Sequence, residues 1–237
     1  MNNRLVTLFL LIFCVSSTAL FAQETISTDR PGAGYGTFTV PSKTLLLEAG
    51  GSIGDNVIDF GQLYLRTGLM ENLEIQFNVG SLLFIDGVDG ARVGSQSFAL
   101  KYALGSFANQ KLSLSLFSRT NLPFLNSNYE YYFTRFMVLA DYSINDTWAL
   151  NSNFGYGDFL NGLENGSFNF NLTPSVSINN NTAAYFGYAV TFDENFSSDL
   201  IEGGVTYLLD SSFQLDAGLI YDSAENLYLT IGIAKRF

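Results

Sequence analysis

The sequence predicts an all-β protein, a transmembrane up-and-down antiparallel β-barrel of the outer-membrane type. Three observations indicate this fold: an export signal at the start of the 237 residues, apolar and polar positions that alternate through most of the chain, and a strand pattern that ends on Phe237. In residues 227–237 (LYLTIGIAKRF) nearly every second position carries a large apolar side chain, so one face of the strand is apolar and the other is polar or has small residues. Outer-membrane barrels end in strands of this kind, and we expect the barrel-assembly machinery to bind this one.

Residues 1–22 are predicted to be a cleaved signal peptide. Arg4 gives the positive start, an apolar stretch follows, and small residues lead to the expected cleavage after Ala22. A lipoprotein signal at Cys14 is the alternative, but the bulky Phe13 before it disfavours lipidation. The chain is therefore expected to be exported to the cell outer membrane of a Gram-negative envelope.

Composition excludes several classes of function. The sequence has no histidine, and its single cysteine is removed with the signal peptide. We therefore predict no disulfide, no metal site, no cofactor and no catalytic residues, because the usual histidine base of hydrolases is missing. The formal net charge of −11 becomes −12 without Arg4, which disfavours nucleic acid as a partner.

The mature chain is predicted to consist of a lead-in segment, residues 23–43, and a barrel, residues 44–237. Beyond residue 22 no apolar run approaches the ~20 residues of a membrane-spanning helix. Alternation instead predicts twelve strands, and an even number returns both termini to the periplasm. The strands are Thr44–Ile53, Val57–Leu69, Leu73–Gly80, Ser95–Leu104, Lys111–Thr120, Glu130–Ile144, Thr147–Tyr156, Ser167–Ile178, Thr182–Phe192, Leu200–Leu209, Phe213–Tyr221 and Leu227–Phe237.

The predicted connections alternate between short and long. Short turns rich in Asn, Asp and Ser are expected at 70–72, 145–146, 179–181 and 210–212, and longer loops at 81–94, 121–129, 157–166, 193–199 and 222–226. This asymmetry is typical of periplasmic turns and extracellular loops, and only the short connection 54–56 departs from it. Acidic residues gather in the loops, which we expect to be solvated and which could bind divalent cations that bridge to lipopolysaccharide.

A soluble secreted β-sandwich is the competing fold, because its strands also alternate. Aromatic residues make up 15% of the chain, and those at outward positions would need a second covering layer in water. In lipid they need none, so the membrane barrel is favoured. Such a barrel has to close, because an open sheet edge in lipid leaves backbone groups unpaired.

Residues 28–50 read TDRPGAGYGTFTVPSKTLLLEAG, which resembles the start of the outer-membrane transporter family named for the MetA pathway of phenol degradation. The matching positions are Thr28, Asp29, Arg30 and Pro31, then Thr39, Val40 and Pro41, then Glu48 and Gly50. Residues 207–219 and 232–237 are also similar to the family. The resemblance implies an outer-membrane barrel with a proposed role in passing small molecules, aromatic or hydrophobic ones included, and it implies no particular substrate.

The lead-in segment is predicted to be ordered without forming a strand. Pro31 and Pro41 fix the backbone, and glycines between them permit close approach. One interpretation is a cap on the periplasmic mouth that holds the first strand. The other is a small plug or constriction, in which Asp29 and Arg30 enter the lumen.

If the apolar positions face lipid, ten charged residues of the strands face the lumen. They are Glu48, Arg66, Glu74, Lys101, Arg119, Arg135, Asp141, Glu202, Asp216 and Arg236. One interpretation is a network of ion pairs that holds the wall together. The other is a constriction in which Arg66, Arg119 and Arg135 select among small solutes.

Aromatic residues near strand ends are predicted to form the girdles at the membrane interfaces. They are Tyr64, Tyr102, Tyr142, Trp148, Tyr156, Tyr207 and Tyr221. A path for hydrophobic solutes would instead use Tyr185, Tyr228 and Phe117. The leading function is a porin-like passive channel for small solutes, and the alternative is a closed structural or surface-interaction barrel without transport.

Overall fold

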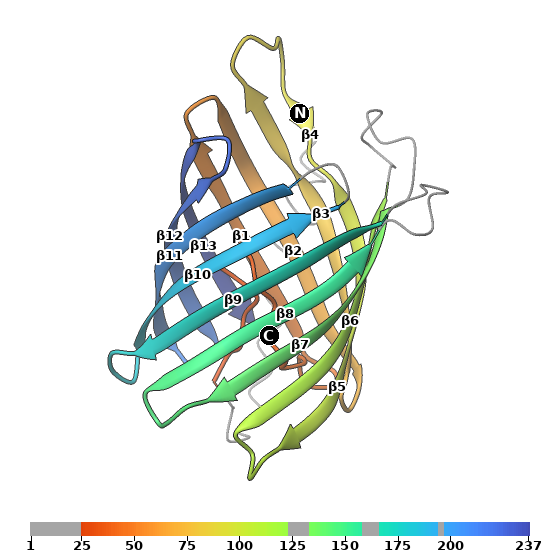
Figure 1. Ribbon diagram of the computed structural model, residues 1–237, viewed down its shortest axis with the longest axis vertical. Coiled ribbons are helices and arrows are strands. Elements are labelled where there is room, and N and C mark those ends of the chain that lie inside the picture. The colour runs from red at the N-terminus through yellow and green to blue at the C-terminus, as the bar shows by residue number, and fades with distance from the viewer. Residues whose placement is uncertain (1–24, 123–132, 158–165, 194–196) are drawn as a thin grey trace, which may run out of the picture.

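The protein is a closed antiparallel β-barrel (Figure 1). The computed structural model describes residues 25–122, 133–157, 166–193 and 197–237. Within these ranges it has thirteen strands, of which β4 contains two residues and pairs only with β3, so twelve strands form the wall. No helix in the described part of the chain is long and apolar enough to cross a membrane.

All twelve predicted strands are present, with their ends shifted by a few residues. The strands are β1 Leu45–Gly54, β2 Val57–Met70, β3 Leu73–Ile85, β4 Arg92–Val93, β5 Gln96–Phe107, β6 Leu112–Leu122, β7 Phe133–Ser143, β8 Trp148–Gly157, β9 Ser167–Ser177, β10 Thr182–Phe192, β11 Ser197–Asp210, β12 Phe213–Asp222 and β13 Leu227–Arg236. The first three residues of the predicted strand at 130–144 lie outside the described residues.

Each wall strand pairs with its neighbours in sequence, and the first and last strands close the ring. Strand β1 pairs with β13 in a continuous antiparallel register from Leu46↔Arg236 to Gly54↔Tyr228. No strand edge of the wall is left open, which is what the hydrocarbon interior of a membrane demands. The predicted fold class is confirmed.

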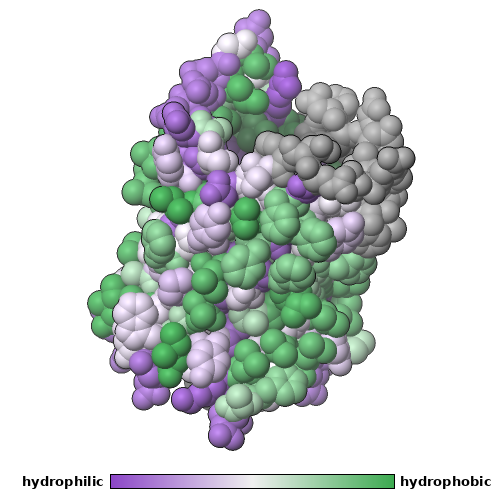
Figure 2. All heavy atoms as spheres, in the orientation of Figure 1, coloured by the Kyte–Doolittle hydropathy of each residue, from purple (hydrophilic) through white to green (hydrophobic). Residues whose placement is uncertain are grey.

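Side chains sort by parity along the strands. In β13, Leu229 and Ile231 are exposed on the outside, whereas Thr230 and Ala234 are buried on the inside. Figure 2 shows apolar side chains covering most of the wall below a hydrophilic upper end. Apolar atoms exposed over such a continuous band fit a lipid surround and not water.

Strands β2 and β3 change parity midway. Gly61 and Gly80 adopt φ of 78° and 92°, and the register between the two strands shifts between Phe60 and Tyr64. Such bulges insert an extra residue and move the following side chains to the other face. The prediction that β3 ends at Gly80 was therefore wrong. The strand continues into the predicted loop 81–94, where β4 pairs with its last third.

The two ends of the barrel differ. We call the end that carries the connections 71–72, 108–111, 144–147, 178–181 and 211–212 the turn end, and the opposite end the loop end. At the turn end, Asn145 Oδ1 accepts hydrogen bonds from the backbone N–H groups of Thr147 and Trp148. Asn179 Oδ1 accepts hydrogen bonds from the backbone N–H groups of Asn181 and Thr182. These side chains satisfy the tight turns, as the Asn-rich composition predicted.

Residues 25–43, which we call the inner segment, lie inside the barrel (Figure 1). Near its start, the backbone N–H of Ile26 donates to the carbonyl of Ser211 at 2.8 Å. Near its end, Val40 packs with Ile26, Leu46 and Ala234 in a small apolar cluster. Both ends of the segment are thus fixed at the turn end, and its middle reaches into the lumen.

Candidate functional site

Carboxylates of the barrel wall bind the backbone of the inner segment. Glu48 accepts hydrogen bonds from the N–H groups of Asp29 and Arg30, at 3.2 and 3.1 Å. The N–H groups of Ala33, Thr37 and Val40 donate to Glu202, Asp141 and Glu74, at 2.9, 2.7 and 2.6 Å. A backbone without secondary structure needs such acceptors when it is buried, so four predicted lumen acids supply what a β-ladder supplies elsewhere.

Asp29 lies at the centre of this contact. Its carboxylate pairs with Arg66 at 3.2 Å and with Lys101 at 2.9 Å, and it accepts a hydrogen bond from Gln76 at 2.9 Å. Burial raises the pKa of Asp29, but the positive charges of Arg66 and Lys101 outweigh burial and lower this pKa to about 2. The carboxylate is therefore ionised at neutral pH.

Arg66 joins the inner segment to two strands. Besides Asp29, its guanidinium pairs with Glu48 on β1 at 2.6 Å and with Glu74 on β3 at 2.7 Å. The side chain is only 2% exposed. A guanidinium offers several donors in a fixed plane, which lets one cation serve three acids.

Arg30 contacts the strands on both sides of the junction between β1 and β13. It donates to Gln62 Oε1 at 2.7 Å and to the carbonyl of Ile231 at 3.0 Å, and it pairs with Asp216 at 3.4 Å. The guanidinium lies against Gly50 and Gly232, where a Cβ atom on either residue would overlap it. These glycines are direct partners on β1 and β13, so they form a bare patch of wall on which Arg30 rests.

Tyr35 anchors the far side of the inner segment. Its backbone N–H donates to Asn153 Oδ1 at 2.7 Å, and its carbonyl accepts from the side-chain amides of Asn151 and Asn153. Its ring stacks on Phe117 with 4.6 Å between centroids. The segment is thus fixed on β6 and β8 as well as on β1, β2 and β3.

Arg119 stands apart from the acids. Its Nη1 atom donates to the hydroxyl of Tyr35, and its guanidinium carbon lies 4.9, 5.5 and 5.7 Å from the ring centroids of Tyr35, Tyr64 and Phe117. Arg135 is its direct partner across the β6–β7 ladder. Aromatic faces, which carry partial negative charge, surround this cation.

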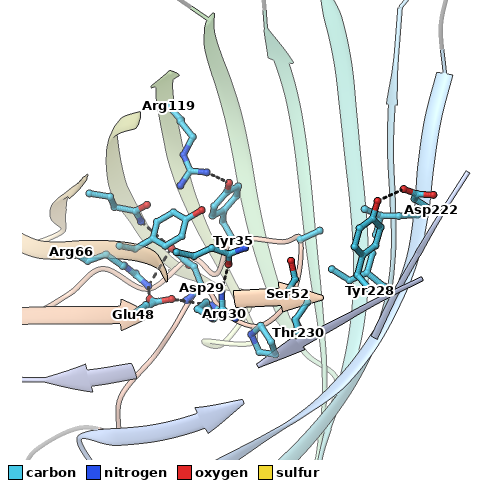
Figure 3. Close-up of a pocket in the computed structure, with 18 residues that line it drawn as sticks. Asp29, Arg30, Tyr35, Glu48, Ser52, Arg66, Arg119, Asp222, Tyr228 and Thr230 are labelled. Carbon is cyan, nitrogen blue, oxygen red and sulfur yellow. Dashed lines mark hydrogen bonds and ion pairs between the residues drawn. The ribbon is translucent and has the colours of Figure 1, made fainter. Parts of the chain in front are cut away.

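A cavity of about 430 Å³ lies on the loop-end side of the inner segment (Figure 3). Its floor includes Asp29, Arg30 and Tyr35. Figure 3 shows Arg119 on one side, pointing toward Tyr35, and the bonded pair Tyr228 and Asp222 on the other side. The volume falls in the range of small-molecule sites, about 300 to 1,000 Å³.

The structure brings most predicted lumen charges into contact with the inner segment. Glu48, Arg66, Glu74 and Lys101 form one cluster around Asp29, as described above. Asp141, Glu202 and Asp216 meet the segment from other strands. Arg236 is placed differently, at the turn end, where its Nη2 atom is 3.5 Å from the carbonyl of Ser211.

Several residues of the site were not predicted. Tyr64 was assigned to an interface girdle, but it lines the cavity beside Arg119. Its parity with Arg66, two positions along β2, was the signal for an inward side chain. Tyr35 carried no such signal, because the inner segment has no periodicity. Two of the residues predicted to form a path for hydrophobic solutes lie near the cavity: the ring of Phe117 stacks on Tyr35, and Tyr228 lines the cavity.

Solved structures similar to this barrel include outer-membrane porins and channels. An outer membrane channel from Pseudomonas putida F1 has a TM-score of 0.64 and 12% identity, and the similarity covers 87% of this chain and 99% of that one. The KdgM porin in complex with disordered oligogalacturonate has a TM-score of 0.62 and 7% identity, with 81% of this chain and 99% of that chain covered. The CymD monoaromatic hydrocarbon channel has a TM-score of 0.53 and 8% identity, with 84% of this chain and 89% of that chain covered.

Sequence comparison adds no assignment. No protein-family model and no curated protein matches the chain. The resemblance of residues 28–50 to the MetA-pathway family therefore stays a prediction. At these identities the structural similarity establishes the fold alone, the twelve-stranded barrel of outer-membrane channels.

Proposed function

We propose that this protein is a porin-like outer-membrane channel that passes small solutes passively, with the inner segment as its constriction. The observation that carries the proposal is the cavity of about 430 Å³ inside a closed twelve-stranded wall, with the inner segment as its floor. Twelve strands enclose more space than the eight that side chains alone fill, and less than the sixteen of general porins. A narrow conduit fits that size.

Three further arguments support this function. The fold is shared with proteins described as porins and channels, one of them for monoaromatic hydrocarbons. The resemblance to the MetA-pathway family indicates aromatic or hydrophobic solutes among the cargo. The sequence has no histidine, which disfavours a hydrolase with a histidine base.

The proposed location follows from the fold and the export signal. We place the barrel in the outer membrane, after cleavage of the signal peptide, with its turn end and both termini in the periplasm. The apolar outer surface would contact lipid, the loop end lipopolysaccharide, and β13 the barrel-assembly machinery. Heat-modifiable migration on unboiled gels tests the membrane barrel, and extraction from membranes by salt alone would contradict it.

Ion current across planar bilayers tests the channel. Purified protein is expected to give small, stable conductance steps, and deletion of residues 26–40 is expected to give larger ones, because the floor of the cavity is removed. The Arg92→Gln variant serves as a control, since Arg92 is exposed at the loop end, away from the lumen. Absence of current from the full chain would refute the channel.

A second function remains open on one specific observation. The inner segment is hydrogen-bonded or ion-paired to ten of the twelve wall strands, which is the arrangement of a filled barrel. A closed structural barrel, whose loops bind surface partners, would use such a segment as a permanent core. In that case only the deletion variant would conduct.

A further inference from the structure

Arg119 lies on β6, and its partners in the structure are a hydroxyl and aromatic rings. Among the described residues no carboxylate lies within ion-pair distance of it, whereas Arg30, Arg66 and Lys101 each pair with at least one. Its Nε atom is buried and has no hydrogen-bond partner within the described part of the chain. The side chain nevertheless lines the cavity above the inner segment, where a solute would reach it.

The acids that line the same cavity are already engaged. Asp29 is held by Arg66 and Lys101, and Glu48 by Arg66 and two backbone N–H groups. Asp222 accepts hydrogen bonds from Tyr228 and Asn226, at 3.2 and 2.9 Å, within its own turn. Asp222 keeps its negative charge, since its partners are neutral, but it lies across the cavity from Arg119 (Figure 3). On its own side of the cavity, Arg119 is a cation to which no described carboxylate is bound.

Removing part of a guanidinium from water costs free energy unless it finds a partner. The rings of Tyr35, Tyr64 and Phe117 offset part of this cost, because their faces attract a guanidinium. A carboxylate would offset the rest, since it binds a guanidinium through paired charge-assisted hydrogen bonds. Tyr64, Leu200 and Ile220 line the cavity as well and offer apolar contact to the rest of such a molecule.

We propose that Arg119 is a binding site for the carboxylate group of a small solute with a flat apolar body. This proposal rests on the proposed channel function for the route by which the solute arrives, and it adds the charge and shape of the cargo. The carboxylate binds the guanidinium at the cavity wall, and the apolar body lies beside Tyr64. The inner segment below closes the site toward the turn end.

Calorimetric titration with benzoate tests the site directly. Benzoate serves as the probe, and benzamide, which has the same shape and no charge, serves as its neutral counterpart. The detergent-solubilised protein is expected to bind benzoate and not benzamide. Arg119→Gln should weaken benzoate binding about tenfold or more, the value of a lost charge-assisted pair.

Two further variants keep the test sharp. Arg119→Lys retains the charge without the planar fork, so its affinity for benzoate should fall between those of wild type and Arg119→Gln. Arg92→Gln removes an exposed arginine of β4 and should bind benzoate as wild type does. Equal affinity of wild type for benzoate and benzamide, or unchanged benzoate binding in folded Arg119→Gln, would overturn the proposal.

Current measurements separate this site from the channel itself. In a salt gradient, wild type is expected to prefer anions, and Arg119→Gln to lose part of that preference. Current without benzoate binding would refute the Arg119 site and leave the channel intact. Benzoate binding without current would refute the channel and support the site.

Discussion

The carboxylate of Asp29 lies 3.2 Å from the guanidinium of Arg66, and this ion pair joins the inner segment to the barrel wall. Because Arg66 also pairs with Glu48 and Glu74, one side chain connects the segment with two neighbouring strands. The stability of the wall and the position of the segment therefore depend on the same cation.

Replacing Arg66 should destabilise the whole barrel. In Arg66→Met, three buried acids lose their shared cation, and breaking a buried pair costs about 3 to 5 kcal/mol. Urea unfolding in detergent, followed by the fluorescence of Trp148, the only tryptophan, measures the free energy of unfolding. Arg92→Gln is the control and should unfold as wild type does. An equal midpoint in Arg66→Met would contradict the role assigned to this network.

Acid should loosen the inner segment. The pKa of Asp29 is lowered from 3.8 to about 2. The ionised carboxylate therefore stabilises the folded state fully at pH values above the ordinary pKa of 3.8. This contribution, about 2 kcal/mol, is lost as pH falls from ~4 through ~2. The groups facing Asp29 are Arg66, Lys101, Gln76 and Glu48.

The Asp29→Asn variant isolates that contribution. It lacks the titrating group, so the difference in unfolding free energy between wild type and variant should shrink as the pH is lowered. Unfolding titrations at several pH values between ~6 and ~2 follow it. A constant difference over this window would show that the charge of Asp29 has no part in holding the segment.

The glycine pair beneath Arg30 should be intolerant of side chains. Gly232→Val would place atoms where the Arg30 guanidinium lies, which should displace the inner segment and enlarge the conductance. The one cysteine of the sequence, Cys14, lies in the predicted signal peptide, so a cysteine introduced at Ala33, on the floor of the cavity, can report displacement by its rate of labelling.

Gly203→Ala is the matched control for that prediction. A Cβ atom there would meet its nearest neighbour at 3.4 Å, an ordinary contact. Labelling and conductance should stay at the wild-type level in this variant. If Gly232→Val behaved like Gly203→Ala, Arg30 would not depend on the bare patch of wall.

Charges on the outer surface should be costly in proportion to depth. Ile231 is 60% exposed at the middle of β13. The Ile231→Arg substitution should destabilise the protein folded in a bilayer by about 2 to 4 kcal/mol. Leu227, at the loop end of the same strand, should cost only ~0 to 1 kcal/mol when changed to Arg. Equal costs in liposome refolding would argue against a membrane belt centred on Ile231.

The fold was predictable because alternation acts along each strand alone. β9 and β13 keep one parity throughout, and their bounds match the predictions within a residue. β2 and β3 do not, because the bulges at Gly61 and Gly80 reverse parity in mid-strand. A glycine with positive φ cannot be told from other glycines by sequence, so the extension of β3 through Ile85 was missed.

Of the candidate site, the sequence predicted mainly the charged residues that the wall strands contribute. Parity placed the charges of β1, β2, β3 and β5 inside, but it could not say that their main partner is the inner segment. That segment is held largely by backbone N–H groups, which every residue except proline has, so these contacts leave no trace in side-chain identity. Asp29 and Arg30 were the exceptions, since their charges indicated entry into the lumen.

The meeting of Gly50 and Gly232 on β1 and β13 also bears on the order of assembly. These two strands are the first and last of the wall, so the ladder between them forms only when the ring is completed. Arg30 rests on both glycines and donates to the carbonyl of Ile231 on β13, so it reaches its final position only with that ladder. The final contacts of Arg30 are therefore complete only in the closed ring, which couples the position of the inner segment to closure of the wall.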